Sequence, residues 1–82
     1  MLLVAFNDDR FYSDHLYGIG ILDGETINDS SEIFGWPVGA KNNPVSLFVG
    51  DYHDAHKMLK KFDEAYRKGD RVFYFYPESV NP

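Results

Sequence analysis

A stripe of apolar side chains at helical spacing is the clearest pattern in the chain, and it lies between residues 51 and 68. At about 100° per residue, the charged residues and histidines of this segment fall on the rest of the circumference. Asp51 suits the N-cap, with Asp54 in the first turn, and Gly69 suits the left-handed position after the last turn. The pattern predicts an amphipathic helix over 51–68 that packs through its stripe of Tyr52, Ala55, Met58, Leu59, Phe62, Ala65 and Tyr66.

Two strands are predicted on either side of this helix. Residues 71–76 are aromatic and β-branched and stop at Pro77, which is typical of a strand. Residues 45–49 have the same character and follow a turn-like sequence at 41–44. Residues 77–82 are expected to form a loose tail.

A hairpin is predicted in the first half of the chain. The pair Asp23-Gly24 lies between two strand-like runs, and a type I′ turn needs positive φ at both of its central residues, which this pair tolerates. Residues 16–22 are therefore expected to pair with residues 25–28. Gly18 and Gly20 inside the first of these strands indicate a bulge, or a ring or Ile27 lying across bare backbone.

The remaining segments complete the predicted fold. Residues 2–7 form an apolar strand with Asn7-Asp8-Asp9 as its turn, and residues 29–44 are interpreted as a loop that places Ile33, Phe34 and Trp36 against the core. No repeat or linker interrupts the chain. We expect one α+β domain over 1–82, with a four- or five-stranded, mainly antiparallel sheet and one helix packed on one face.

Composition narrows the class of protein. The chain has 82 residues and no cysteine, which excludes a disulfide scaffold, thiolate catalysis and cysteine-based zinc sites. The apolar run over 1–6 is too short to span a bilayer, and no basic segment precedes it. These features predict a cytoplasmic protein that does not enter a membrane.

Acidic side chains are concentrated in the first half. The net charge of the whole chain is −5, and residues 1–50 hold seven acidic and two basic side chains. Residues 51–82 hold six of each. This distribution argues against direct binding of a nucleic acid and favours a partner with a basic surface.

The helix start contains metal-ligand residue types in Asp51, His53, Asp54 and His56. The histidines are three residues apart, so their rings diverge around the helix, unlike the i, i+4 pair of a zinc-binding helix. We interpret this segment as a solvated first turn and predict no metal site.

Patterns for catalysis and for cofactors are similarly incomplete. Ser13, Asp14 and His15 have the residue types of a hydrolytic triad, but neighbours on a chain point apart and triad members converge from distant segments. The glycines at 18, 20 and 24 miss the dinucleotide spacing, and no helix follows them. The acidic residues near Gly24 miss the calcium-loop pattern. No catalytic residue and no cofactor is predicted.

Aromatic residues make up 17% of the chain, more than one helix covers. In the last strand, alternation sends Phe73 and Phe75 to one side and Tyr74 and Tyr76 to the other. The phenylalanines are expected to meet the helix. The tyrosine side is either covered by the N-terminal strand and the loop at 34–37, or open as a surface for a partner or a second copy of the chain.

These features favour a non-enzymatic protein-binding module, in which acidic loops attract a basic partner and exposed aromatic rings anchor it. As a class, compact acidic domains of this size resemble the small phage-encoded inhibitors that block host nucleic-acid-handling machines, such as restriction or CRISPR effectors. That resemblance implies a viral anti-defence protein, although no motif identifies a family. The expected partner-binding residues are Asp8, Asp9, Asp14, Asp29, Glu32, Trp36, Tyr74 and Tyr76.

Two other functions stay open at this stage. Tyr74 and Tyr76 could stack the bases of a single-stranded nucleic acid, with phosphates held by Lys57, Lys60, Lys61, Arg67, Lys68 and Arg71. The net charge opposes this function, and the lysines of the helix would face away from the exposed side of the sheet. A small metal protein or enzyme would use His15, His53 or His56, which have suitable chemistry without a recognisable geometry.

Overall fold

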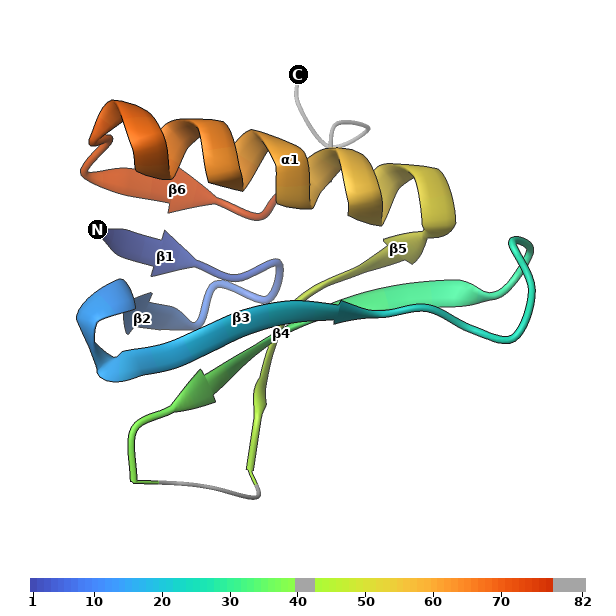
Figure 1. Ribbon diagram of the computed structural model, residues 1–82, viewed down its shortest axis with the longest axis horizontal. Coiled ribbons are helices and arrows are strands. Elements are labelled where there is room, and N and C mark those ends of the chain that lie inside the picture. The colour runs from blue at the N-terminus through green and yellow to red at the C-terminus, as the bar shows by residue number, and fades with distance from the viewer. Residues whose placement is uncertain (40–42, 78–82) are drawn as a thin grey trace.

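The computed structural model describes residues 1–39 and 43–77 and has an α+β fold, as predicted (Figure 1). Six strands form two sheets of three strands each, whereas a single sheet of four or five strands was expected. Sheet A has the order β2-β1-β6, and sheet B has the order β3-β4-β5. Along the chain the elements are β1 (Leu2–Val4), β2 (Arg10–Tyr12), the 3-10 helix η1 (Ser13–His15), β3 (Leu16–Leu22), β4 (Ser30–Pro37), β5 (Val45–Asp51), α1 (Tyr52–Lys68) and β6 (Val72–Tyr74).

The helix and both of its caps are confirmed. The Asp51 side chain accepts a hydrogen bond from the Asp54 backbone N–H at 2.8 Å, and Gly69 adopts the left-handed conformation with φ 79°. The buried residues of α1 all belong to the predicted stripe, and they are Ala55, Met58, Phe62 and Ala65. Leu59 is half-buried and Tyr66 is exposed. Within the described residues, no helix is long and apolar enough to cross a membrane.

Sheet A has β1 at its centre, paired antiparallel with β2 and parallel with β6. The expected turn after β1 is present, because Asp8 has φ 70° and the Asn7 side-chain oxygen accepts a hydrogen bond from the Asp9 N–H at 3.2 Å. The strands predicted over 2–7 and 71–76 are both shorter in the structure. Strand β2 was not predicted, since three residues are too few to show an alternating pattern.

Sheet B corrects the predicted hairpin. Strand β3 has the expected bounds, but it pairs with β4 and not with residues 25–28. Neither Asp23 nor Gly24 has the positive φ that a type I′ turn requires. Instead, the Asp23 carboxylate accepts a hydrogen bond from Ser31 Oγ at 2.7 Å. The connection between the two strands is therefore a loop over 23–29, and the turn is not the tight one that the sequence suggested.

The interpretation of residues 29–44 as a loop is also wrong in part. Residues Ser30–Pro37 form β4, the central strand of sheet B. Ser31, Ile33 and Gly35 are buried while their neighbours are more exposed, which is the two-residue alternation of a strand. Residues 40–42 of the expected loop and 78–82 of the expected tail lie outside the described residues.

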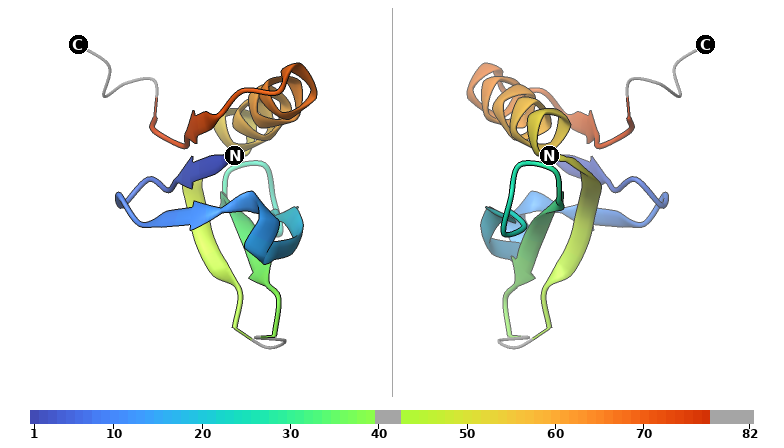
Figure 2. Two further views of the ribbon diagram at one scale, coloured as in Figure 1. Left: turned by 90° about the vertical axis from the view of Figure 1, so that its left-hand side faces the viewer. Right: turned by 90° about the vertical axis from the view of Figure 1, so that its right-hand side faces the viewer.

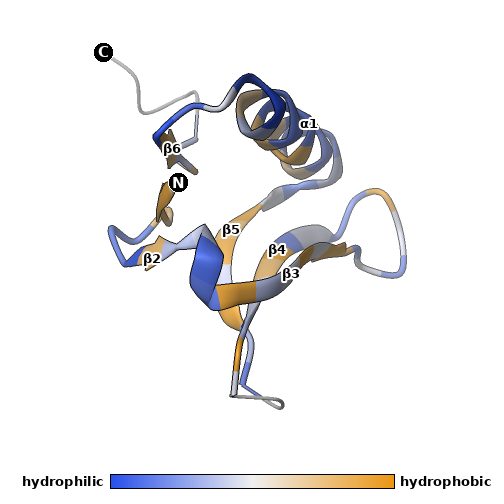
Figure 3. Ribbon diagram, turned by 60° about the vertical axis from the view of Figure 1, so that its left-hand side comes forward, coloured by the Kyte–Doolittle hydropathy of each residue, from blue (hydrophilic) through white to orange (hydrophobic). Residues whose placement is uncertain are grey.

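The core lies where the two sheets and the helix meet. Figure 2 shows α1 lying across the strands on one side of the molecule, and Figure 3 shows its apolar side turned toward them. Phe62 of α1 contacts Phe73 and Phe75, with ring centroids 5.5 and 5.7 Å apart, so the predicted contact between the helix and these phenylalanines is confirmed. The largest fully buried apolar side chains belong to β1, β4 and β5, or directly follow β6. They are Phe48, Phe75, Leu3, Ile33, Leu47 and Val4.

Both explanations offered for the glycines of β3 are correct. The register of β3 against β4 shifts between Leu16 and Gly18, which is a bulge or similar irregularity. At Gly20, the ring of Trp36 lies so close that an added Cβ would stand 3.3 Å from it. Bare backbone at Gly20 is therefore what allows the indole to approach the strand this closely.

Candidate functional site

The outward side of sheet A is the candidate functional surface. The register places Tyr12 and Val72 on either side of Leu2, and Arg10 and Tyr74 on either side of Val4. Directly paired residues point to the same side of a sheet. The alternate row of Leu3, Phe11 and Phe73 packs against the core, so the first two rows face outward. We call this outward surface the tyrosine face, and it consists of Leu2, Arg10, Tyr12, Val72 and Tyr74.

The tyrosine face exposes its two tyrosines and Val72, whereas Val4, which lies between Arg10 and Tyr74 in the same row, is fully buried. Tyr12, Tyr74 and Val72 have exposed fractions of 59%, 53% and 38%, respectively. Strand β1 pairs beside β6 and does not lie over it, and residues 34–37 belong to β4 of the other sheet. Among the described residues, neither of the two segments that the sequence offered as a cover therefore lies over Tyr12 and Tyr74.

Three predicted partner-binding residues from opposite ends of the chain meet beside this face. The hydroxyl of Tyr76 donates a hydrogen bond to the Asp8 carboxylate, and the ring centroids of Tyr74 and Tyr76 lie 5.3 Å apart. Because that hydrogen bond favours the protonated phenol, the pKa of Tyr76 is raised above its ordinary value. The contact fixes the turn after β1 against the end of β6.

Two further predicted acids lie at the ends of β2. Asp9 occupies the turn before β2, where its carboxylate accepts a hydrogen bond from Asn7 Nδ2 at 3.1 Å. Asp14 lies in η1, directly after β2. Acidic groups therefore flank Tyr12 along the chain on both sides, with Arg10 as the one basic residue of the face.

The other three predicted residues lie elsewhere. Asp29 closes the β3–β4 loop by accepting a hydrogen bond from the Thr26 N–H at 3.0 Å. Glu32 is opposite Leu22 and Val49 in sheet B, and Trp36 covers Gly20 of the same sheet. The eight predicted residues therefore do not form one surface.

Tyr12 belongs to the tyrosine face but was missed from the sequence. The alternation of Arg10, Phe11 and Tyr12 does indicate a strand with one apolar side, although three residues give only a weak pattern. Its position opposite Leu2 follows from the pairing of β1 with β2, which the sequence does not specify.

A second group of polar residues joins the β3–β4 loop to the helix. Asp23 accepts from Ser31 Oγ at 2.7 Å and lies 2.8 Å from Nε2 of His56, and the ring of Tyr52 stacks on His56 with centroids 4.2 Å apart. The hydrogen bond from Ser31, together with His56, lowers the pKa of Asp23. His56, which the helix pattern placed in water, is thus half-buried against this loop.

The order of these groups does not suit nucleophilic catalysis. In a hydrolytic triad the imidazole lies between the carboxylate and the hydroxyl, so that it can remove the hydroxyl proton. Here the carboxylate of Asp23 lies between Ser31 and His56. This arrangement holds the loop against α1 and offers Ser31 no base other than a carboxylate of lowered pKa.

Candidate metal ligands are similarly dispersed. Asp51 caps the helix, His56 contacts Asp23, and the ring of His53 lies against Tyr52. His15, the third histidine considered from the sequence, lies in η1, and its ring is 5.9 Å from that of Tyr12 in β2. Within residues 1–39 and 43–77, no group of three or more histidine, aspartate or glutamate residues could hold a metal ion.

Comparisons with protein-family models, with curated proteins and with solved structures found no match to this chain.

Proposed function

We propose that this chain is a non-enzymatic protein-binding module whose tyrosine face binds a partner with a basic surface. The observation that carries the proposal is the exposure of Tyr12 and Tyr74 on the uncovered side of a three-stranded sheet. Small monomeric domains seldom leave such an apolar side bare, and tyrosine is enriched at the centres of protein interfaces. A tyrosine ring provides contact area with little conformational freedom to lose, and its hydroxyl can bond at a wet rim.

The acidic residues beside the tyrosine face support a partner surface of positive charge. Asp8, Asp9 and Asp14 lie at the two ends of β2, next to the face, and Arg10 is the one basic residue among the five that form it. Like charges at close range repel, whereas a basic surface is attracted over roughly a Debye length, about 10 Å at 0.1 M salt. The acids are expected to raise the association rate, and the rings to slow dissociation.

The first class of partner to test follows from the resemblance to small acidic phage inhibitors. A host nucleic-acid-handling complex of the defence systems, such as a restriction or CRISPR effector, presents the basic surface that this face requires. In this function the chain would occupy the surface that otherwise binds nucleic acid.

The decisive experiment compares face variants with a matched control. Immobilised wild-type chain, Tyr12→Ala, Tyr74→Ala and Val49→Ala are exposed to purified effector complexes, and binding is followed by surface plasmon resonance. Val49 is a suitable control because it is an apolar residue with an exposed fraction of 39% that lies in β5 of sheet B. Each face variant is expected to bind about tenfold or more weakly, the effect of losing an interface hot spot, while Val49→Ala binds like wild type.

Other outcomes would replace the proposal. If Tyr12→Ala and Tyr74→Ala bind like wild type, the face is not the binding surface. If the wild-type chain binds a labelled single-stranded oligonucleotide and Tyr74→Ala does not, the function is nucleic-acid binding. If sedimentation equilibrium shows a dimer that Tyr74→Ala abolishes, the face pairs two copies of the chain.

A further inference from the structure

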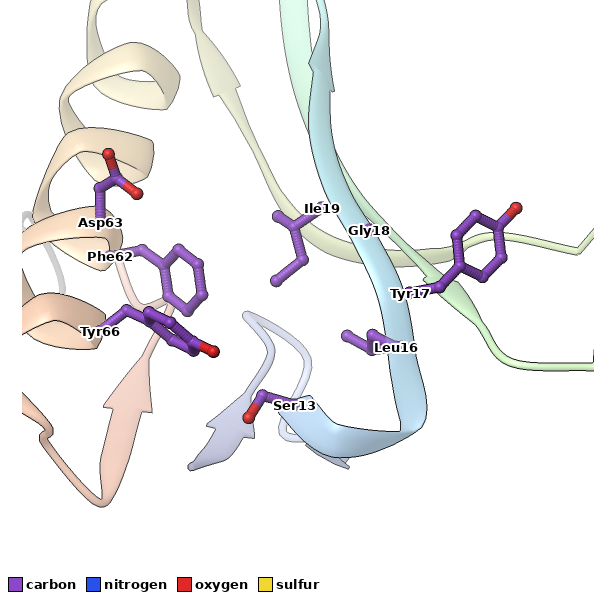
Figure 4. Close-up of a pocket in the computed structure, with 8 residues that line it drawn as sticks. All are labelled: Ser13, Leu16, Tyr17, Gly18, Ile19, Phe62, Asp63 and Tyr66. Atoms are coloured by element: carbon purple, nitrogen blue, oxygen red, sulfur yellow. The ribbon is translucent and has the colours of Figure 1, made fainter.

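A groove of about 260 Å³ lies between β3 and the second half of α1. Its apolar wall comes from Leu16 and Ile19 on one side and from Phe62 and Tyr66 on the other, with Asp63 at the rim. Figure 4 shows Ile19 and Phe62 pointing toward one another across the groove, while the ring of Tyr17 points away from it. The volume lies below the range of about 300 to 1,000 Å³ that is typical of small-molecule sites, so it suits single side chains better than a cofactor.

The strand that borders this groove has an unpaired edge. In sheet B, β3 is an edge strand, and outside its ladder with β4 no residue from 17 to 22 makes a backbone hydrogen bond within the described part of the chain. In an antiparallel edge strand, alternate residues direct both N–H and C=O away from the neighbouring strand. These groups are available to an added strand.

The sequence of β3 lacks the usual protection of an edge. Its seven residues contain no charged side chain and no proline, and they include two glycines. Natural edge strands are normally short, charged, interrupted by proline or covered, because a long apolar edge pairs readily with another chain. An added Cβ on Gly18 would meet no atom within 4 Å, so the face of the strand is also open at this residue.

We propose that the β3 edge and the groove bind an extended, basic peptide segment of a partner protein. The backbone of the segment pairs with β3, an apolar side chain enters between Ile19 and Phe62, and a lysine or arginine lies beside Asp63. Residues 16 to 19 all line the groove although successive side chains of a strand point to opposite sides, so the groove follows the edge of the strand and is not confined to one face.

Charge complementarity selects a basic segment. Asp63 is the charged residue of the groove lining, and its pairing with Arg67 at 3.5 Å involves two exposed side chains. Such a surface ion pair contributes little to stability, so a cation of the peptide can replace Arg67 at low cost. The net charge of −5 acts in the same direction.

This proposal is tested with a panel of short fluorescein-labelled peptides. In each peptide, valine, leucine or phenylalanine alternates with lysine. A second panel replaces lysine with glutamate, and a third methylates alternate backbone nitrogens to block strand pairing. Fluorescence anisotropy should show saturable binding of a lysine peptide, weaker binding of its glutamate counterpart, and loss of binding on one pattern of methylation.

Variants of the chain locate the binding. Tyr66→Ala should weaken binding about tenfold, which corresponds to about 1.4 kcal/mol, and Asp63→Lys should weaken it roughly two- to fivefold, as expected for an exposed ion pair. Glu64→Lys is the matched control, because it makes the same charge change one residue away from the groove lining. Amide shifts in nitrogen-15 spectra should concentrate on β3 and the second half of α1.

The outcomes separate this proposal from the function of the tyrosine face. Tyr74→Ala should leave peptide binding unchanged, because that residue lies in sheet A. The groove is not a peptide site if no peptide binds saturably, if every methylated peptide binds as well as its parent, or if the amide shifts fall on sheet A. Self-association through β3, seen as dimers whose β3 amides become protected from exchange, would assign the edge to a second copy instead.

Discussion

Replacement of Phe62 by alanine should remove a large part of the stability of the domain. Phe62 lies where the helix meets sheet A, with an exposed fraction of 8%, and its ring packs against those of Phe73 and Phe75. Removing a buried phenylalanine typically costs about 3 to 5 kcal/mol, because apolar burial is lost and a cavity remains. The T-shaped contact with Phe73 places this site in the upper half of that range, since such ring pairs add about 0.5 to 1.5 kcal/mol.

Leu59 provides an internal comparison on the same helix. The sequence pattern alone predicts a cost of about 2 to 5 kcal/mol for Leu59→Ala and for Phe62→Ala alike, since both belong to the apolar stripe. In the structure Leu59 is only half-buried, so its removal forms a smaller cavity. We expect Leu59→Ala to cost about 1 to 2 kcal/mol, at most about half of the effect at Phe62.

Urea unfolding followed by far-UV circular dichroism measures both effects. A domain of 82 residues is expected to have a free energy of unfolding of about 4 to 12 kcal/mol, at roughly 0.05 to 0.15 kcal/mol per residue, so Phe62→Ala approaches the limit of folding. Lys60→Ala, at an exposed position of α1, serves as the control. Equal midpoints for wild type and Phe62→Ala would refute the assigned core, and a larger loss at Leu59 than at Phe62 would refute the assigned helix orientation.

Four further predictions follow from single contacts. Asp51→Ala removes the helix cap and should cost about 0.5 to 2 kcal/mol in urea unfolding, whereas Asp51→Asn should retain most of the stability; equal losses would contradict a capping role. Gly50→Ala should cost about 1 to 3 kcal/mol, because its Cβ would stand 2.7 Å from the buried ring of Phe48, while Gly18→Ala should be tolerated; the reverse order would contradict the packing. Ser31 and His56 lower the pKa of Asp23 in the folded state, so the contribution of Asp23 to stability should be complete above its ordinary pKa of 3.8 and be lost as the pH falls through the lowered value. Asp23→Asn should therefore reduce the loss of stability at acid pH, measured as the urea midpoint against pH. An unchanged acid part of this profile would show that the contact is not formed in solution. In surface plasmon resonance with a partner that binds, Asp8→Lys combined with Asp9→Lys should mainly slow association, whereas Tyr74→Ala should mainly speed dissociation. Association rates that do not depend on salt would contradict the role given to the acids.

The extent and the caps of the helix could be predicted because their determinants are local. The stripe, the cap at Asp51 and the left-handed residue Gly69 all lie within one continuous segment. The pairing partners of the strands are not local. Asp23-Gly24 is a favourable hairpin pair when its neighbours alone are considered, but the Asp23 carboxylate bonds to Ser31 and His56, which are 8 and 33 positions away. A side-chain contact at that separation leaves no periodic pattern in the sequence.

Of the candidate surface, the sequence could predict only which side of a strand each side chain faces, because side chains alternate along a strand. The pattern of the last strand correctly sends Phe73 toward the core and Tyr74 away from it. Whether Tyr74 is then covered depends on strand order, because the same apolar segment at the N-terminus could lie over β6 or pair beside it. The parallel pairing of β1 with β6 uses the β1 backbone instead of its side chains, and this leaves Tyr74 bare.

The same pairing explains which of the residues selected by charge and aromatic content lie near one another and which do not. Because β1 joins β2 to β6, the turn that holds Asp8 reaches Tyr76 at the far end of the chain, and Tyr12 comes to lie on the same side of the sheet as Tyr74. Tryptophan is a common anchor at interfaces, but Trp36 lies across Gly20 in sheet B, where its ring already packs against the backbone. Residue type therefore identifies which side chains can anchor a partner, and the position of one central strand decides which of them share a surface.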